Sequence, residues 1–161
     1  MVLFQSGNIN LKRQRIISIV GTRKITTSGI VFCEDLVEKL SIYNPVIVSG
    51  FAYGTDITAH KTAMKNNLQT IGCLAHGLNQ IYPKAHKKYM VDMEKNGGFF
   101  TDFWSSDNFD KNNFLKRNRV IAGLSEATIV IESAEKGGSL VTADIANSYN
   151  REVFAVPGRI T

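Results

Sequence analysis

The sequence has few residues that cross-link or stiffen a chain, with two cysteines and three prolines among 161 residues. Cys33 and Cys73 stand in apolar surroundings and form no C-x-x-C pair, so we expect two buried free thiols in a reducing cytoplasm. No stretch approaches about 18 consecutive apolar residues, and no membrane span is expected. The first residues lack the basic start, apolar run and cleavage site of a secretory signal peptide, so none is expected.

The common signatures of a catalytic centre are also missing. The chain has no H-E-x-x-H metal motif, no G-x-S-x-G nucleophile elbow and no Walker ending G-K-[ST]. His60 follows Asp56 at a spacing that fits one helix face, but no third ligand accompanies them, and a capping Asp beside a helical His is the simpler interpretation. His76 and His86 have no recognisable partners. We therefore expect no catalytic residue, no metal site and no cofactor.

The composition is that of an ordinary folded protein, with 43% hydrophobic and 20% charged residues. The length is about that of one domain, and such a chain buries enough surface to fold without a metal or a disulfide. The net charge of +5 is compatible with a polyanionic partner but does not demand one. Whether the charge indicates such a partner depends on where the cations lie in the sequence.

The order of the hydrophobic segments predicts the fold class. The opening, Met1–Arg15, is poorly periodic and is expected to be a tail or the remnant of an upstream segment. Residues 16–161 are expected to form one domain. The predicted strands are Ile16–Val20, Val46–Ser49, Thr70–Leu74, Gly98–Asp102, Ala127–Glu132 and Glu152–Val156. Most are continuous apolar runs, which is typical of parallel strands buried on both faces.

Amphipathic segments separate these strands. The predicted helices are Ser28–Ser41, Thr55–Asn66, His86–Lys95, Phe114–Leu124 and Ser139–Tyr149. Strands that alternate with helices predict an α/β fold with a doubly wound, mainly parallel sheet and helices on both faces. Glycines follow most of the strands, at the sheet edge where ligands of such folds bind.

Two glycine loops could bind phosphate. The segment 49–54 joins a strand to a helix that Thr55 or Asp56 could cap, and free amides at such a helix start attract anions. Gly138 and Ser139 open the helix after the fifth strand, and Ser139 is a natural N-cap. Either loop could instead be only a tight turn.

Two groups of cations stand near these loops. Arg23 and Lys24 follow a strand end, and Arg offers a planar fork that suits phosphate oxygens. The run 111–119 holds four cations, one aromatic and no acid. Cations that neutralise phosphates beside an aromatic that stacks on a base suit a single strand. The alternatives are solvated surface cations, and a helix with a basic outer face and Phe114 in the core.

Together these motifs resemble the DprA family, also called Smf, for DNA processing protein A. The resemblance covers about residues 16 to 158. It is carried, in order, by V-G-T-R at 20–23, S-G-F-A-x-G-x-D at 49–56 with His60, I-Y-P at 81–83, R-N-R-x-I-A-G-L-S at 117–125, G-S-L-x-T-A at 138–143 and R-E-V-F-A-V-P-G at 151–158. The usual Pro after Phe114 is Leu115, Thr55 replaces an Ile, and Gly137 replaces a Ser.

The resemblance implies an extended Rossmann-like fold that binds single-stranded DNA, protects it and loads the RecA recombinase during natural transformation. It also implies a homodimer in the full-length protein and no catalytic activity. The family's region runs on past V-P-G, so the chain is expected to be a core fragment or a shortened member. The family's binding residues map onto Arg23, Lys111 and Phe114.

The residues selected for contact with DNA or its phosphates come from all four motifs. They are Gly21, Thr22, Arg23, Ser49, Gly50, Phe51, Gly54, Lys111, Phe114, Arg117, Asn118, Arg119, Gly138 and Ser139.

Two alternatives stay open. Rossmann-like nucleoside-monophosphate phosphoribohydrolases, related to lysine-decarboxylase-like proteins, carry P-G-G-x-G-T-x-x-E, and here Gly137 and Gly138 are followed by Asp144 at the acid position, without the Pro or the Gly-Thr. The other alternative is a nucleotide-binding regulatory module with no role in DNA binding.

Overall fold

The computed structural model describes residues 1–12 and 14–158, and their strands form one seven-stranded sheet. The strands are β1 (Phe4–Asn8), β2 (Ile16–Val20), β3 (Val46–Ser49), β4 (Thr70–Cys73), β5 (Gly97–Thr101), β6 (Ala127–Val130) and β7 (Glu152–Ala155). Their order is β1-β5-β4-β3-β2-β6-β7, and every neighbouring pair is parallel except β1 and β5. The predicted doubly wound, mainly parallel α/β sheet is confirmed.

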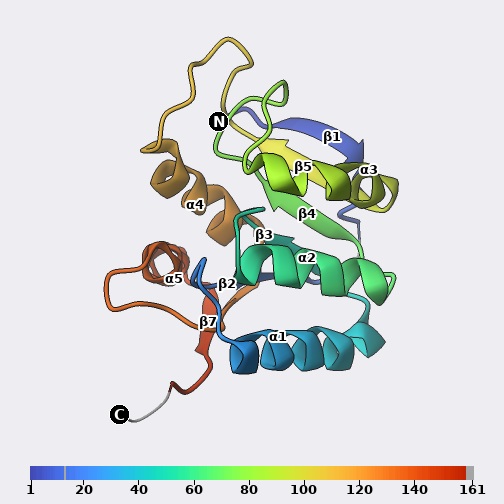
Figure 1. Cartoon of the computed structure of the whole chain (residues 1–161), viewed down its shortest axis with the longest axis vertical. Coiled ribbons are helices and arrows are strands. Elements are labelled where there is room, and N and C mark those ends of the chain that lie inside the picture. Colours follow the sequence, from blue (N-terminus) through green and yellow to red (C-terminus); the bar gives the residue numbers. More distant parts are fainter. Residues whose placement is uncertain (13, 159–161) are drawn as a thin grey trace.

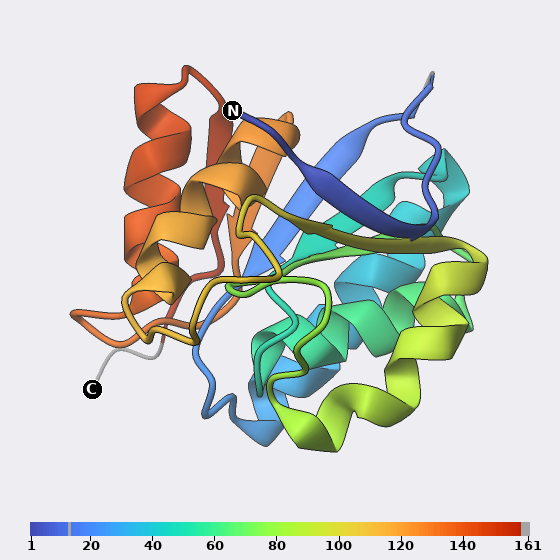
Figure 2. The same cartoon turned by 90° about the horizontal axis from the view of Figure 1, so that it is seen from above.

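Helices cover both faces of this sheet (Figure 1 and Figure 2). The helices are α1 (Thr27–Leu40), α2 (Thr55–Lys65), α3 (Lys87–Lys95), α4 (Asn113–Leu124) and α5 (Gly138–Ser148), with short 3-10 turns at Ser41–Tyr43 and Lys84–His86. α1, α2 and α3 lie on one face, and α4 and α5 on the other. Within the described ranges, no helix combines the length and the apolar character needed to cross a bilayer.

The sheet forms the centre of the core because its strands are buried on both sides. All four residues of β3 are buried, as its continuous apolar pattern predicts. Val46 and Val48 pack in the cluster that includes α4 and α5 residues, whereas Ile47 packs with Cys33 and Val37 of α1. Successive side chains of one strand therefore hold helices on opposite faces.

The strand order reverses at β2. From β2 the chain adds β3, β4 and β5 toward one edge, and then returns to place β6 and β7 on the other side of β2. The loops that follow β2 and β6 therefore leave the same sheet edge in different directions. Ligands of open α/β sheets bind in the crevice at such a switch point.

The opening segment, expected to be a tail or an upstream remnant, contributes strand β1 to the sheet edge. Phe4–Asn8 pairs antiparallel with Gly97–Thr101. Gly98 has φ of 152°, and a Cβ there would collide with the carbonyl oxygen of Ser6. Because Gly98 has no side chain, β5 can pair closely with β1, although β1 has little hydrophobic pattern of its own.

Candidate functional site

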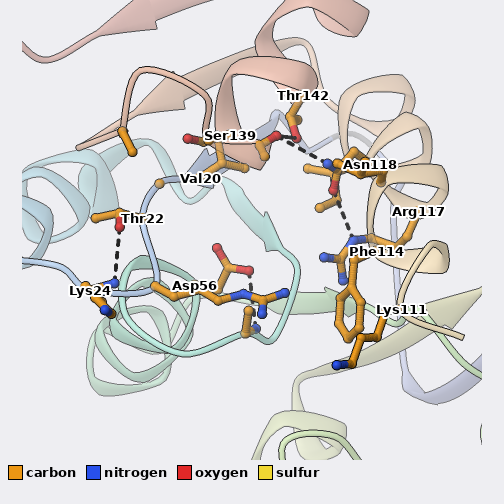
Figure 3. A pocket seen from close by; sticks show the side chains of 18 of the residues that line it. Val20, Thr22, Lys24, Asp56, Lys111, Phe114, Arg117, Asn118, Ser139 and Thr142 are labelled. Carbon is orange, nitrogen blue, oxygen red and sulfur yellow. Dashed lines mark hydrogen bonds between the residues drawn. The ribbon is translucent and has the colours of Figure 1, made fainter. Parts of the chain in front are cut away.

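A cavity of about 670 Å³ opens at the switch point between β2 and β6. Its walls come from the loop after β2, the start of α2, the inner side of α4 and the start of α5. Figure 3 shows Thr22 and Lys24 on one side of the cavity and Lys111 and Phe114 on the opposite side. The four motifs that are far apart in the sequence therefore meet at one place.

The loop after β2 delivers two cations to the cavity. The amide of Thr22 donates to the carbonyl of Glu132 at 2.7 Å, which ties this loop to the end of β6. The hydroxyl of Thr22 accepts a hydrogen bond from the amide of Lys24 at 3.1 Å and tightens the turn. Arg23 and Lys24 are both exposed, so their charges are available to a ligand.

Aromatic rings form the wall opposite this loop. Phe114 is half-buried, and its ring centroid lies 5.4 Å from that of Tyr82 and 5.9 Å from that of Phe109. The guanidinium carbon of Arg23 lies over the Phe114 ring, 4.9 Å from its centroid, and so stacks a cation on the aromatic wall. Lys111 is exposed at the cavity rim. Cations and aromatic rings therefore lie next to one another in the same cavity.

Arg117 lines the cavity but acts as a clamp between three segments. Its side chain is buried, and Nη1 donates to the carbonyls of Gly50 at 2.8 Å and Cys73 at 2.7 Å. Nε donates to Oδ1 of Asn118 at 3.3 Å. Burial lowers the pKa of Arg117, and the nearby Asp56 carboxyl opposes that shift. Arg117 holds α4 against the ends of β3 and β4 through Nη1 and Nε, while Nη2 forms no hydrogen bond with the described residues.

Two amides of the glycine loop after β3 are not free for a ligand, because Asp56 accepts hydrogen bonds from them. Oδ2 of Asp56 accepts from the amides of Gly50 at 3.1 Å and Ala52 at 3.2 Å. Helix α2 has Gly54 as its N-cap and no side-chain cap, so the predicted capping role of Thr55 or Asp56 is wrong. Burial raises the pKa of Asp56, and Arg117 and these amides pull it the other way. The carboxyl occupies the place where a phosphate would accept these bonds.

A close backbone approach explains why this loop needs a glycine. A Cβ added at Gly50 would lie 2.6 Å from Oδ2 of Asp56 and 2.9 Å from Cζ of Arg117. The two opposite charges therefore face each other across Gly50. The loop is held by hydrogen bonds to the Asp56 carboxyl on one side and to the Arg117 guanidinium on the other.

The other two residues of the R-N-R motif also make internal contacts. Nδ2 of Asn118 donates to the carbonyl of Gly138 at 3.3 Å, which fixes α4 to the start of α5. Arg119 pairs with Asp102, which follows β5. Neither contact reaches a ligand.

The start of α5 differs from the prediction by one residue. The helix begins at Gly138 with an extended Gly137 as its N-cap, so Ser139 lies in the first turn and is not the cap. The Ser139 hydroxyl donates to the Ser133 hydroxyl at 2.8 Å. The first amides of a helix lack acceptors within it, and here they border the cavity.

The cavity collects nine of the fourteen predicted residues, and five lie elsewhere. It is lined by Gly21, Thr22, Arg23, Lys111, Phe114, Arg117, Asn118, Gly138 and Ser139. The residues outside its lining are Ser49, Gly50, Phe51, Gly54 and Arg119. Ser49 and Phe51 are core residues, 0% and 1% exposed, because the strand end that carries them runs beneath the helices. Neither residue can therefore contact a ligand directly.

Sequence reasoning did not select Tyr82 and Phe109 as site residues. Their side chains are 37% and 43% exposed and complete the aromatic wall. Tyr82 stood in the quoted Ile-Tyr-Pro segment, but no spacing links it to Phe114, because their contact is tertiary. The acid position of the hydrolase signature, Asp144, is exposed on α5 and outside the cavity lining.

Comparisons with known proteins identify the family to which the chain belongs. The family model for "DNA recombination-mediator protein A" matches residues 1–161. The chain belongs to this family. It is 39% identical over 160 residues to DNA processing protein DprA of Bacillus subtilis and 35% identical over 160 residues to that of Streptococcus pneumoniae. These matches cover 99% of this chain but 54% and 56% of the two relatives, so the chain spans about half the length of the curated relatives it matches.

Solved structures of DNA processing protein A have the same fold as this chain. DNA processing protein A from Streptococcus pneumoniae superposes with a TM-score of 0.88 at 35% identity, over 98% of this chain and 56% of that one. The protein from Helicobacter pylori, reported for its single-stranded DNA binding mode, gives 0.89 at 30% identity, over 99% and 73%. A molybdenum cofactor binding protein from Rippkaea orientalis, at 0.66 and 17% identity over 92% of this chain and 79% of that one, shares the fold alone. The expected family and fold are confirmed.

Proposed function

We propose that this chain binds single-stranded DNA in the cavity at the switch point and acts as the strand-binding part of a recombination mediator. The observation that carries the proposal is the stacking of Arg23 on the Phe114 ring, with Lys111 in the lining of the same hollow. Cations there can neutralise phosphates, while the rings of Phe114, Tyr82 and Phe109 offer faces to unpaired bases.

The contacts of the R-N-R motif refine which residues do this. Arg117 is buried and bonded to two backbone carbonyls, and Arg119 is paired with Asp102. Arg23, Lys24 and Lys111, in contrast, are exposed residues of the cavity lining. The phosphate-binding cations are therefore Arg23, Lys24 and Lys111. The Helicobacter pylori relative, whose reported property is its single-stranded DNA binding mode, supports the same ligand.

The proposal extends to the partners of the longer protein. The RecA recombinase receives the bound strand, and dimerisation brings two such cavities together on it. Family membership supports this role, in which we propose that the protein performs no chemistry on the DNA. The proposed activity is binding and delivery.

A titration with a fluorescent single strand over a range of salt concentrations tests the proposal. Arg23→Gln and Lys111→Gln should each weaken binding and flatten the log–log salt slope by roughly 0.7, the value for one lost phosphate contact on a single strand. Lys39→Gln is the matched control, because Lys39 is an exposed cation on α1 that lies outside the cavity lining. Equal slopes for all four proteins would show that the cavity does not hold the strand.

A further inference from the structure

A second basic and aromatic surface lies between α2 and α3. Its hollow, called here the α2–α3 groove, has a volume of about 490 Å³ and is lined by Lys61, Met64, Lys65 and Tyr89 among others. Lys61 Nζ lies 5.7 Å and Lys88 Nζ 5.2 Å from the centroid of the Tyr89 ring. The groove thus repeats the combination of cations and an aromatic ring found in the cavity.

The charge of this surface is not neutralised within the protein. Lys61 and Lys65 of α2 are exposed, as are Lys84, Lys87 and Lys88 at the start of α3. Among the ion pairs formed by the described residues, none involves these five lysines. The acid that lines the groove, Asp92, pairs with Lys95 at 2.8 Å. The surface therefore presents a free positive charge.

A row of aromatic rings runs from the groove to the loop before α2, with the buried His86 as its middle member. Tyr53 is 45% exposed, and its ring lies 5.0 Å from the ring of His86, which lies 6.0 Å from that of Tyr89. Nδ1 of His86 donates to the carbonyl of Phe51 at 3.0 Å and anchors this row of rings to the loop after β3.

The same loop touches the cavity side. The amide of Thr55 donates to the carbonyl of Thr22 at 3.2 Å, so the segment that carries Tyr53 packs against the segment that carries Arg23. The row of rings therefore starts on the loop that packs against the Arg23 segment and ends in the groove.

We infer that a single strand held in the cavity continues over Tyr53 into the α2–α3 groove, where Lys61, Lys65 and Lys88 bind its phosphates. The inference rests on the proposed function. A phosphodiester strand fits better than an acidic protein segment, because an aromatic ring lies beside the cations of each hollow and the loop that carries Tyr53 packs against the loop that carries Arg23.

The length dependence of binding tests this path. Oligo-dT of about 4 nucleotides is short enough for the cavity alone, and oligo-dT of about 16 nucleotides can reach the groove, a range that matches single-strand site sizes. The triple variant K61Q/K65Q/K88Q should bind the short oligomer as wild type does. For the long oligomer its log–log salt slope should be flatter by about 2, at roughly 0.7 for each lost contact.

The matched control is K12Q/K39Q/R151Q. It removes the same three positive charges from exposed residues that line neither hollow, so it should keep the wild-type slope with both oligomers. Tyr53→Leu should weaken binding of the long oligomer by roughly 5- to 150-fold, the range for one lost base stack, and leave the short one unchanged.

The outcomes separate the two proposals. If the groove variant loses affinity equally for both lengths, matches the charge control, or keeps wild-type binding throughout, the strand does not follow the groove while the cavity proposal stands. If the wild type binds neither oligomer, the proposed function fails and the groove path fails with it.

Discussion

Replacement of Arg117 by Met separates a structural clamp from a DNA ligand. The variant keeps a similar volume but loses the donors that reach the carbonyls of Gly50 and Cys73 at 2.8 and 2.7 Å. It also removes the cation that faces the buried Asp56. Each buried carbonyl left without its donor costs about 1–3 kcal/mol, which gives roughly 2–6 kcal/mol for the two. We expect the free energy of unfolding to fall by that amount.

Urea unfolding followed by circular dichroism measures this loss. Arg117→Lys should be intermediate, because an ammonium keeps the charge but lacks the planar fork that serves both carbonyls. Adding Asp56→Asn to Arg117→Met should cost less than the sum of the single variants, since the isolated charge is then gone. A change in stability within about 0.5 kcal/mol, the range of surface substitutions, together with a flatter salt slope for DNA, would refute the clamp and make Arg117 a phosphate ligand.

Two further predictions concern the aromatic wall and a buried histidine. Phe114→Leu should weaken single-strand binding by about 1–3 kcal/mol with the salt slope nearly unchanged, as anisotropy titrations would show; if the variant unfolds instead, Phe114 belongs to the core. Burial lowers the pKa of His60 to about 3. Below about pH 6.5 the unfolded chain therefore binds a proton at this residue that the folded chain excludes. The free energy of unfolding consequently decreases as the pH is lowered from about 6.5 toward 3. Between about pH 7.5 and about 4.5 the wild type should lose roughly 2–3 kcal/mol more than His60→Gln in urea unfolding, and parallel pH profiles would contradict this.

The sheet was predictable because its signal is local. Val46–Ser49 is a continuous apolar run, and a strand with this pattern has to be buried on both faces. The loops after β2 and β6 could likewise be assigned to one edge, because parallel strands share the direction of their carboxyl ends. Strand β1 has no such pattern, and its pairing depends on the glycine backbone of β5.

The roles of the charged residues were less predictable because they depend on distant acceptors. Arg117 is a residue type that is mostly exposed. Here it is buried because carbonyls 67 and 44 residues away accept its hydrogen bonds. Asp56 stood at a helix start and was interpreted as a cap, but the amides it binds belong to the loop before the helix. The composition of their segments and the family resemblance select Arg23, Lys111 and Phe114 as candidates, and the fold places them around one cavity.

The preference for single over double strands tests the central claim most directly. Phosphate attraction alone would serve a duplex equally well, whereas stacking on Phe114, Tyr82 and Phe109 requires unpaired bases. The measurement is a titration of the protein with matched fluorescent single- and double-stranded oligonucleotides at one fixed salt concentration. The cavity of Arg23, Lys111 and Phe114 predicts tighter binding of the single strand, and equal affinity for the two forms would contradict it.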